Sequence, residues 1–376
     1  MIRGPAPHAV LLVGADGVGK TTLALDLAAG LLCTAAVDAR PCRACRACRL
    51  VASGGHPDLH RLGPVGPGRQ VVIGGPDARF RGVRDLIGEL VLMPVEGGAR
   101  VAIVEGAERM NEDAQSALLK TLEEPPAGVT IVLCADQEAR LLPTVRSRCA
   151  RVRLGLVGPR DIEAIVADHG LVDPPTASRL GRIAGGRPGI ALAYARAPEA
   201  IILRAELTRV LLDLTAARPS ARLAAARAAV PRALALAAAL SPVDPASGSS
   251  RSVRRRGGST TVAPETSDGA ADEDAGAMPG VTVPATERRR AVELLLGLWT
   301  DVARDLVLVE TGGSGSVRDV ALLDELRVVA ATIPPASAPT FLARAARAAE
   351  LLASNVSPEL ILDSLVLAWP ARADAA

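Results

Sequence analysis

The sequence predicts an α/β domain with a parallel sheet, followed by a region that is helical almost throughout. Up to about residue 155, short apolar runs alternate with helix-like segments, which is typical of a doubly wound parallel sheet. From about residue 200, apolar residues recur at helical spacing. The chain of 376 residues is also too long for one core, because a domain averages about 150 residues.

The elements of the α/β part follow from the apolar runs and the residues that flank them. In chain order we expect a strand at 8–13, a helix at 22–32, a loop with one strand at 54–75, a helix at 79–94, a strand at 99–106, a helix at 111–126, a strand at 129–136 and a short helix or turn at 140–149. Asn111 is the expected N-cap of its helix, and Pro125 and Pro126 end that helix.

The remainder of the chain is expected to form small helices over 156–200 and longer helices beyond. One insertion, residues 241–286, is rich in Ser, Gly, Pro and Ala and carries a basic cluster followed by an acidic one. Such a composition buries too little apolar surface to fold, so the insertion is predicted to be disordered. Its arginines fit a solvated spacer, and a tether for DNA or a partner is the alternative.

The composition excludes several classes of protein. Hydrophobic content of 49% and charged content of 22% fit a soluble globular protein, and a net charge of +2 gives no electrostatic case for DNA as a dedicated ligand. Only 1% of residues are aromatic, which argues against base-stacking platforms. Without a signal peptide or a membrane-length apolar run, we expect a cytoplasmic protein with no membrane partner.

Residues 14–21, GADGVGKT, fit the phosphate-binding pattern GxxxxGK[ST] between an expected strand and an expected helix. The glycines would let backbone N–H groups face phosphates, while Lys20 reaches the terminal phosphates and Thr21 offers its hydroxyl to Mg²⁺. This pattern predicts a site for ATP or ADP with Mg²⁺, and its candidate residues are Gly14, Gly17, Gly19, Lys20, Thr21 and Thr22. The alternative is a loop that keeps the turn but binds no nucleotide.

Four of the six cysteines cluster at metal-ligand spacing: Cys33, Cys42, Cys45 and Cys48. Four thiolates complete a tetrahedral shell and leave no position for water, so the prediction is a structural rather than catalytic Zn²⁺. Unligated thiols in a reducing compartment are the alternative. Cys134 and Cys149 stand apart and are expected to be small buried apolar residues.

The strand end at residues 101–110, VAIVEGAERM, carries one acid where nucleotide-hydrolysing proteins usually carry two. A strand-end carboxylate normally orients the magnesium water shell, and an adjacent acid polarises the attacking water. Glu105 is therefore a candidate magnesium ligand, whereas Gly106 cannot polarise water. Glu108 lies further along, and we expect it to face a different direction.

Residues 146–149, RSRC, follow the short turn after the last of these strands. An exposed arginine in a nucleotide-binding domain can act across a subunit boundary on a neighbour's γ-phosphate. From spacing alone, a solvated surface arginine is the simpler interpretation.

Taken together, these residues resemble bacterial clamp-loader subunits of the AAA+ class, the family of the delta-prime and gamma/tau subunits of DNA polymerase III. The resemblance rests on the phosphate loop, the cysteine module, ALLKTLEEPP and LLPTVRSRC, and it covers residues 8–200 well. It implies a RecA-like AAA+ domain at 1–155 with a zinc module at 33–48, a small helical lid at 156–200 and an all-α collar at 201–376.

The resemblance also implies roles for particular residues. Arg148, in the serine–arginine–cysteine motif, would act in trans as an arginine finger in the ATP site of an adjacent motor subunit. Motor subunits carry an Asp-Glu pair at the strand end and an arginine in the lid that contacts nucleotide. In this chain Glu105 and Gly106 stand at the first place, and Gly189 stands at the second with Arg187 two residues earlier.

These departures favour the delta-prime branch of the family. A polar Thr or Asn sensor is also missing where Ala135 and Asp136 stand. The expectation is a ring-assembly subunit with a weak or absent ATPase of its own, partnered by gamma/tau and delta subunits. Such a ring loads a sliding clamp onto primed DNA as part of the DNA-directed DNA polymerase holoenzyme, a nucleotidyltransferase complex. The alternatives are an active gamma/tau-type ATPase and a nucleotide-free scaffold or DNA-binding protein on the same fold.

Overall fold

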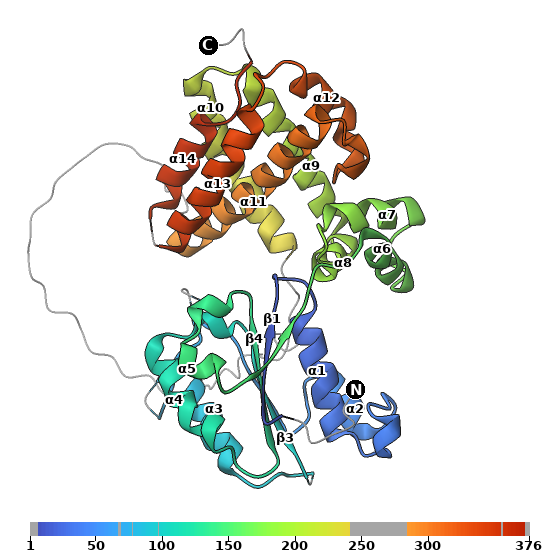
Figure 1. The fold of residues 1–376 in the computed structure, drawn as a ribbon, viewed down its shortest axis with the longest axis vertical. Helices are drawn as coiled ribbons and strands as arrows, with labels where there is room; N and C mark the ends of the chain where they lie inside the picture. Colours follow the sequence, from blue (N-terminus) through green and yellow to red (C-terminus); the bar gives the residue numbers. More distant parts are fainter. Residues whose placement is uncertain are drawn as a thin grey trace, which may run out of the picture.

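A five-stranded parallel sheet lies at the centre of the N-terminal part of the molecule (Figure 1). The computed structural model describes residues 7–66, 69–76, 78–96, 98–240, 284–354 and 356–372. The strands are β1 (Ala9–Val13), β2 (Leu59–Leu62), β3 (Arg100–Val104), β4 (Val129–Ala135) and β5 (Ala150–Arg153), in the order β2-β3-β4-β1-β5. All pairings are parallel, with Leu12 opposite Cys134 in the central pair, so the predicted sheet is confirmed.

Helices cover both faces of this sheet (Figure 1). They are α1 (Lys20–Leu32) and α2 (Arg46–Ala52) on one face, and α3 (Val83–Val91), α4 (Glu112–Glu123) and α5 (Pro143–Arg146) on the other. Leu11 packs into the core beneath α3 and α4, while the next residue, Leu12, packs beneath α1. Successive strand residues point to opposite faces, and both faces are buried, which explains the continuous apolar runs in the sequence.

Most predicted elements of the sheet domain are present, with shifted ends and one omission. Asn111 caps α4 as predicted, because its Oδ1 accepts the N–H of Ala114 at 2.9 Å. Helix α3 begins at Val83 rather than at residue 79, since the backbone at Gly82 is extended and its N–H donates to the Asp85 carboxylate at 2.8 Å. Strand β5 was not predicted, because its four residues are all exposed and two of them are arginines.

Helices form the rest of the described chain (Figure 1). They are α6 (Pro159–Asp168), α7 (Pro174–Ile183), α8 (Pro188–Arg196), α9 (Pro198–Asp213), α10 (Pro219–Ala239), α11 (Ala285–Glu310), α12 (Leu323–Ala330), α13 (Ser337–Ala353) and α14 (Pro358–Leu367). Short 3₁₀ turns lie at Val37–Ala39, Ala107–Arg109, Glu138–Arg140, Leu214–Ala216, Ser314–Ser316 and Val320–Leu322.

One apolar core runs through α6 to α14. Phe341 and Trp369 meet in it edge to face, with ring centroids 4.8 Å apart. Because this core is continuous, the division between lid and collar at residue 200 stays a prediction. No described helix is both long and apolar enough to cross a membrane.

The insertion predicted to be disordered, residues 241–286, lies outside the described residues except for its last three positions. Those positions correct its boundary. Helix α11 begins at Ala285, two residues before the predicted resumption at Glu287.

Candidate functional site

The phosphate-loop sequence forms a tight turn between β1 and α1, as its spacing predicts. Gly17 and Gly19 have φ angles of 78° and 106°, a region that side-chain-bearing residues rarely adopt. The turn opens onto a cleft of about 1630 Å³, bounded also by the ends of β3 and β4, by α8 and by the first turns of α11. Of the predicted nucleotide-binding residues, those that line the cleft are Gly17, Gly19, Lys20, Thr21, Thr22 and Glu105.

Gly14 is the predicted nucleotide-binding residue that the structure places beneath the turn rather than on the cleft wall. Its N–H donates to Ala135 at the end of β4, at 3.2 Å. A Cβ at this position would lie 2.6 Å from the carbonyl oxygen of Leu154. Glycine is therefore required at position 14, because the chain after β5 passes too close to leave room for a side chain.

Lys20 is nearly buried, and its ammonium is fully engaged within the protein. Its Nζ donates to the carbonyl oxygens of Gly14 at 2.8 Å and Ala15 at 2.9 Å. The same nitrogen lies 2.6 Å from Oδ1 of Asp136, the residue that follows β4. Asp136 stands where related nucleotide-binding proteins are expected to carry a Thr or Asn sensor. In this chain it is instead the counterion of the loop lysine.

The strand end after β3 differs from a hydrolytic site in two respects. Glu105 pairs with Arg61 of β2, whose Nε and Nη2 lie 3.0 and 2.6 Å from the same carboxylate oxygen. Gly106 has a φ of 63°, and a Cβ there would lie 2.9 Å from Cγ of Pro64. In this conformation the backbone disfavours any residue with a side chain at position 106, including a second acid.

The expectation that Glu108 faces away from the site is wrong. After the left-handed turn at Gly106, the 3₁₀ turn at Ala107–Arg109 directs Glu108 back toward β4, where it lines the cleft. Its Oε2 accepts the N–H of Asp136 at 3.1 Å, and it is 8% exposed. The sequence did not indicate this direction for Glu108. The chain reverses because of the positive φ angle at Gly106, which residue types alone do not specify.

The first turn of α8 rests directly on the phosphate loop. The N–H of Gly189 donates to the carbonyl oxygen of Gly17 at 2.8 Å, and a Cβ on Gly189 would lie 3.0 Å from that oxygen. Arg187 turns back to donate to Ala184 at 3.3 Å and is not among the described residues that line the cleft.

Arg196 is a cleft residue that sequence reasoning missed. A signal for it was present in the sequence. Gly189, Leu192 and Arg196 are spaced i, i+3 and i+7, which places them on one face of a helix, and all three line the cleft.

Arg148 lies on the turn after α5, outside the described residues that line the cleft. Its Nη1 donates to the carbonyl oxygen of Thr144 at 2.8 Å, and its Nη2 is ion-paired with Glu123 at the end of α4. The side chain is 33% exposed, so it is accessible at the surface while being held in one orientation.

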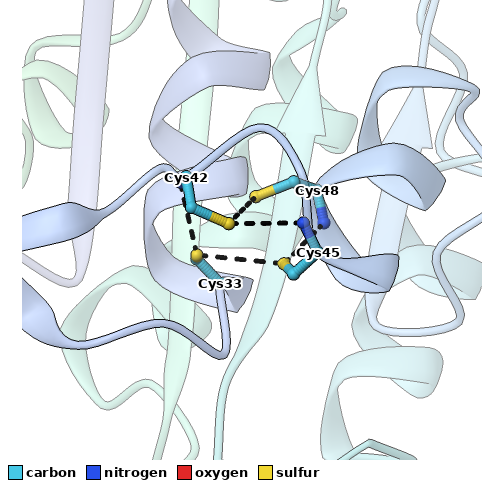
Figure 2. A group of neighbouring side chains, drawn as sticks. All are labelled: Cys33, Cys42, Cys45 and Cys48. Atoms are coloured by element: carbon cyan, nitrogen blue, oxygen red, sulfur yellow. Dashed lines mark hydrogen bonds between the residues drawn. The ribbon is translucent and has the colours of Figure 1, made fainter.

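The four cysteines of the predicted metal site come together, as Figure 2 shows. The Sγ atoms of Cys33 and Cys45 are 3.9 Å apart, those of Cys42 and Cys48 are 4.0 Å apart, and all four lie within 4.8 Å of one another. In a tetrahedral Zn²⁺ site with Zn–S bonds of about 2.3 Å, neighbouring sulfurs are about 3.8 Å apart. The donor set and its spacing therefore fit Zn²⁺, and no other such group occurs in the part of the chain that the structure describes.

Backbone N–H groups surround these sulfurs. Cys45 and Cys48 donate their N–H groups to the preceding cysteine sulfurs at 3.3 and 3.4 Å. The N–H of Cys48, and then that of Thr34, lower the pKa of Cys45 to about 5, so this thiol ionises readily. Burial raises the pKa of Cys48 to about 12. Bound metal would supply the positive charge that stabilises all of the sulfurs as thiolates.

The two remaining cysteines are buried, as predicted. Cys134, in β4, is 1% exposed, and Cys149 is 9% exposed. Burial raises the pKa of Cys149 to about 11. Burial is also the main cause that raises the pKa of Cys134 to about 12, with Glu105 second.

The N-terminal part has an α/β fold with a parallel sheet. A glycine-rich phosphate loop follows its strand β1, and a helical unit rests on that loop. Residues 2–157 match the family described as "DNA polymerase III, delta subunit". Among curated proteins, the chain is 40% identical over 156 residues to the DNA polymerase III subunit delta' of Pseudomonas aeruginosa, which covers 42% of this chain and 45% of that one. The predicted resemblance to the delta-prime branch is thereby confirmed for this part of the chain.

Other known proteins are similar to this chain over parts of their length. The subunit delta' of Escherichia coli is 36% identical over 193 residues, covering 50% of this chain and 55% of that one. The subunit tau of Salmonella typhimurium is 31% identical over 181 residues, covering 47% and 27%. The chain spans about half the length of the delta-prime relatives it matches. A solved gamma subunit-related protein from Thermotoga maritima aligns over 96% of this chain and 93% of its own, at 15% identity and a TM-score of 0.39.

Proposed function

We propose that this chain is a delta-prime-type subunit of the replicative DNA polymerase III clamp loader. In this role it supports assembly of a hetero-oligomeric ring with gamma/tau and delta subunits, in the cytoplasm, and has little or no ATPase activity of its own. The ring loads a sliding clamp onto primed DNA. The proposed division of the chain is a RecA-like domain at 1–155, a lid at 156–200 and a collar at 201–376.

The observation that carries this proposal is the strand end after β3. Glu105 is neutralised by Arg61, and Gly106 adopts a left-handed conformation against Pro64, so the pair of acids that supports hydrolysis is missing. Removing a water-activating group commonly slows turnover by about 10²–10⁴. A phosphate loop beside such a strand end favours holding a nucleotide over hydrolysing it.

The residues of the cleft fit ATP or ADP with Mg²⁺. Backbone N–H groups at Gly17 and Gly19 would face the phosphates, Lys20 would supply positive charge, and the Thr21 hydroxyl would face the metal. A bound nucleotide would contact both the phosphate loop and α8. These two segments already touch, because Gly189 of α8 donates its N–H to the loop. Structural Zn²⁺ would be held by the four clustered cysteines and would fix the module between α1 and α2.

Arg148 is proposed to act on a neighbouring subunit. It lies away from its own cleft, at the surface, and is held by Glu123 and Thr144. A guanidinium in this setting is suited to stabilise the charge that develops on a γ-phosphate across a subunit boundary. The ATP hydrolysed is then that of the adjacent motor subunit.

Reconstitution with the gamma/tau and delta subunits of the same organism tests this proposal. We expect all three proteins to co-elute as one ring, and we expect Arg148→Ala to lower clamp-stimulated ATPase while leaving assembly intact. Lys20→Ala in this chain should leave the ATPase of the ring largely unchanged. A failure to co-elute, or unchanged ATPase with Arg148→Ala, would count against the proposal.

One observation favours a second candidate, an active gamma/tau-type ATPase. Glu108 lines the same cleft as Lys20 and is nearly buried, and in this alternative it would be the acid that activates water. The isolated protein would then hydrolyse ATP at motor rates, and both Lys20→Ala and Glu108→Gln would abolish that activity. Slow or absent hydrolysis by the isolated protein excludes this candidate.

A further inference from the structure

The ammonium of Lys20 has no hydrogen left to donate. A lysine side chain carries three N–H donors. In this structure the acceptors are the carbonyl oxygens of Gly14 and Ala15 and the carboxylate of Asp136. The two carbonyls belong to the phosphate loop itself, whereas Asp136 reaches the lysine from the end of β4. A phosphate can therefore bind Lys20 only by displacing one of these partners, and Asp136 is the one that carries a competing negative charge.

The surroundings of Asp136 are also acidic. Its own N–H is donated to Glu108, so this backbone group is not available to a phosphate. The buried thiol of Cys134 reports the local charge: beyond the effect of burial, Glu105, Glu108 and Asp136 raise its pKa, and Lys20 lowers it. Three carboxylates and one ammonium therefore act on this thiol, and Asp136 is the carboxylate in contact with Lys20.

Positive charge offsets these acids in part: Arg109 lines the cleft beside them, Arg61 lies just outside the cleft lining, and further arginines line other parts of the cleft. Arg61 is paired with Glu105 at 2.6 Å, and Arg109 lies 3.5 Å from the carboxylate of Glu108. Among the described residues, Lys20 is the ion-pair partner of Asp136, whose side chain lines the cleft and is 33% exposed. It is therefore the carboxylate that a phosphate approaching Lys20 meets first.

We propose that Asp136 determines which nucleotide the cleft takes, by occupying Lys20 and so favouring a nucleoside diphosphate over a triphosphate. This inference rests on the proposed binding of nucleotide. A diphosphate can be held by the N–H groups of the loop while the Lys20–Asp136 pair persists. A triphosphate adds a further charged group next to Asp136 and Glu108, and like charges repel more at this partly shielded site than in open water.

Isothermal titration of the purified full-length protein in Mg²⁺ tests this preference, with ADP and a non-hydrolysable ATP analogue as ligands. We expect the wild type to bind ADP roughly tenfold more tightly than the analogue. Asp136→Asn, which keeps the shape and removes the charge, should bring the two dissociation constants to within about threefold, mainly by tightening the analogue. Asp113→Asn is the matched control, because it removes the same charge from an exposed position on α4.

Thermal melting of each variant shows whether it is folded, and Asp136→Ser provides a second neutral replacement. The inference is overturned if both Asp136 variants keep the wild-type ratio, or if the wild type prefers the triphosphate analogue. If neither ligand binds to the wild type or to either variant, both the inference and the proposed nucleotide binding are wrong. Ring assembly is tested separately, by co-elution. Preferential ADP binding without co-elution leaves the inference standing and removes the clamp-loader role.

Discussion

Arg148 and Glu123 form an ion pair that ties the turn after α5 to the C-terminal end of α4. The two residues belong to the two sequence strings, 117–126 and 141–149, that carry much of the family resemblance. The strings are separated by strand β4, and the fold brings them into contact. The arginine proposed to act on a neighbour is therefore oriented by its own subunit before any neighbour is present.

The first prediction concerns this ion pair in the reconstituted ring. Arg148→Ala should lower clamp-stimulated kcat by about 10³-fold or more, as loss of an arginine finger does. Glu123→Gln should lower it only about two- to fivefold, because a half-exposed ion pair contributes about 0.5–1 kcal/mol to orientation. Glu124→Gln, an exposed neighbour, is the control. Equal effects of Glu123→Gln and Glu124→Gln would show that the pair does not position Arg148.

The second prediction is that restoring the missing acid does not restore hydrolysis. Gly106→Glu places a side chain at a φ of 63° with its Cβ 2.9 Å from Cγ of Pro64. We expect a loss of about 1–2 kcal/mol in the free energy of unfolding, measured by denaturant titration, and no gain in ATPase. Gly88→Glu is a control with the same change in composition, since a Cβ at Gly88 meets nothing within 4 Å. ATPase at motor rates in Gly106→Glu would contradict this reasoning.

The sheet and its glycine loop could be predicted because their signals are local. β1 is a continuous apolar run and β3 and β4 are mostly apolar, and the cap at Asn111 depends on a residue and its neighbour three positions on. Strand β5 gave no such signal, since it is an exposed edge strand. Its place in the sheet follows from pairing with β1, which depends on the whole fold.

The candidate site was predictable in its residue types and less so in its pairings. The cysteine spacing alone predicted the cluster that the structure contains. The Lys20–Asp136 and Glu105–Arg61 pairs join residues that are far apart in the sequence, so no local pattern predicts them. The first of these pairs decides how much of the positive charge of Lys20 is left for a phosphate, while other arginines, among them Arg69 and Arg196, also line the cleft.

The third prediction is that the purified protein contains one zinc ion per chain. Metal analysis should find it in the wild type, and Cys45→Ser should lose most of it, because removing one of four thiolates opens the shell. Cys149→Ala should retain the metal, since Cys149 lies in a different part of the core. A strong chelator should lower the melting temperature of the wild type and of Cys149→Ala. Full zinc content in Cys45→Ser would argue against the four-cysteine site.

The fourth prediction concerns Asp305, a buried acid in α11 whose carboxylate accepts the N–H of Arg318 at 3.0 Å. Burial raises its pKa from 3.8 to about 6, although Arg318, Arg304 and Arg204 act in the opposite direction. The folded state therefore binds this proton more tightly than the unfolded state. The associated stability is complete below about pH 4 and is lost as the pH rises through 6.

Asp305→Asn removes this dependence and keeps an oxygen that can accept the same N–H. Between pH 5 and pH 7.5, the wild type should lose about 1.4 kcal/mol of unfolding free energy relative to the variant. Denaturant titrations of both proteins at the two pH values measure the difference directly. Asp324→Asn, an exposed acid in α12, should show no such change. A constant difference between wild type and Asp305→Asn across this range would contradict the proposed burial effect.

The contact between Gly189 and Gly17 has a consequence for how this protein tolerates sequence change. Because the bond joins main-chain atoms, it survives replacement of the neighbouring side chains, and at position 189 only proline would delete the donor. A Cβ at position 189 would instead push the two segments apart. The link between the helical unit and the turn beneath it therefore depends on main-chain atoms, and it requires no particular catalytic side chain.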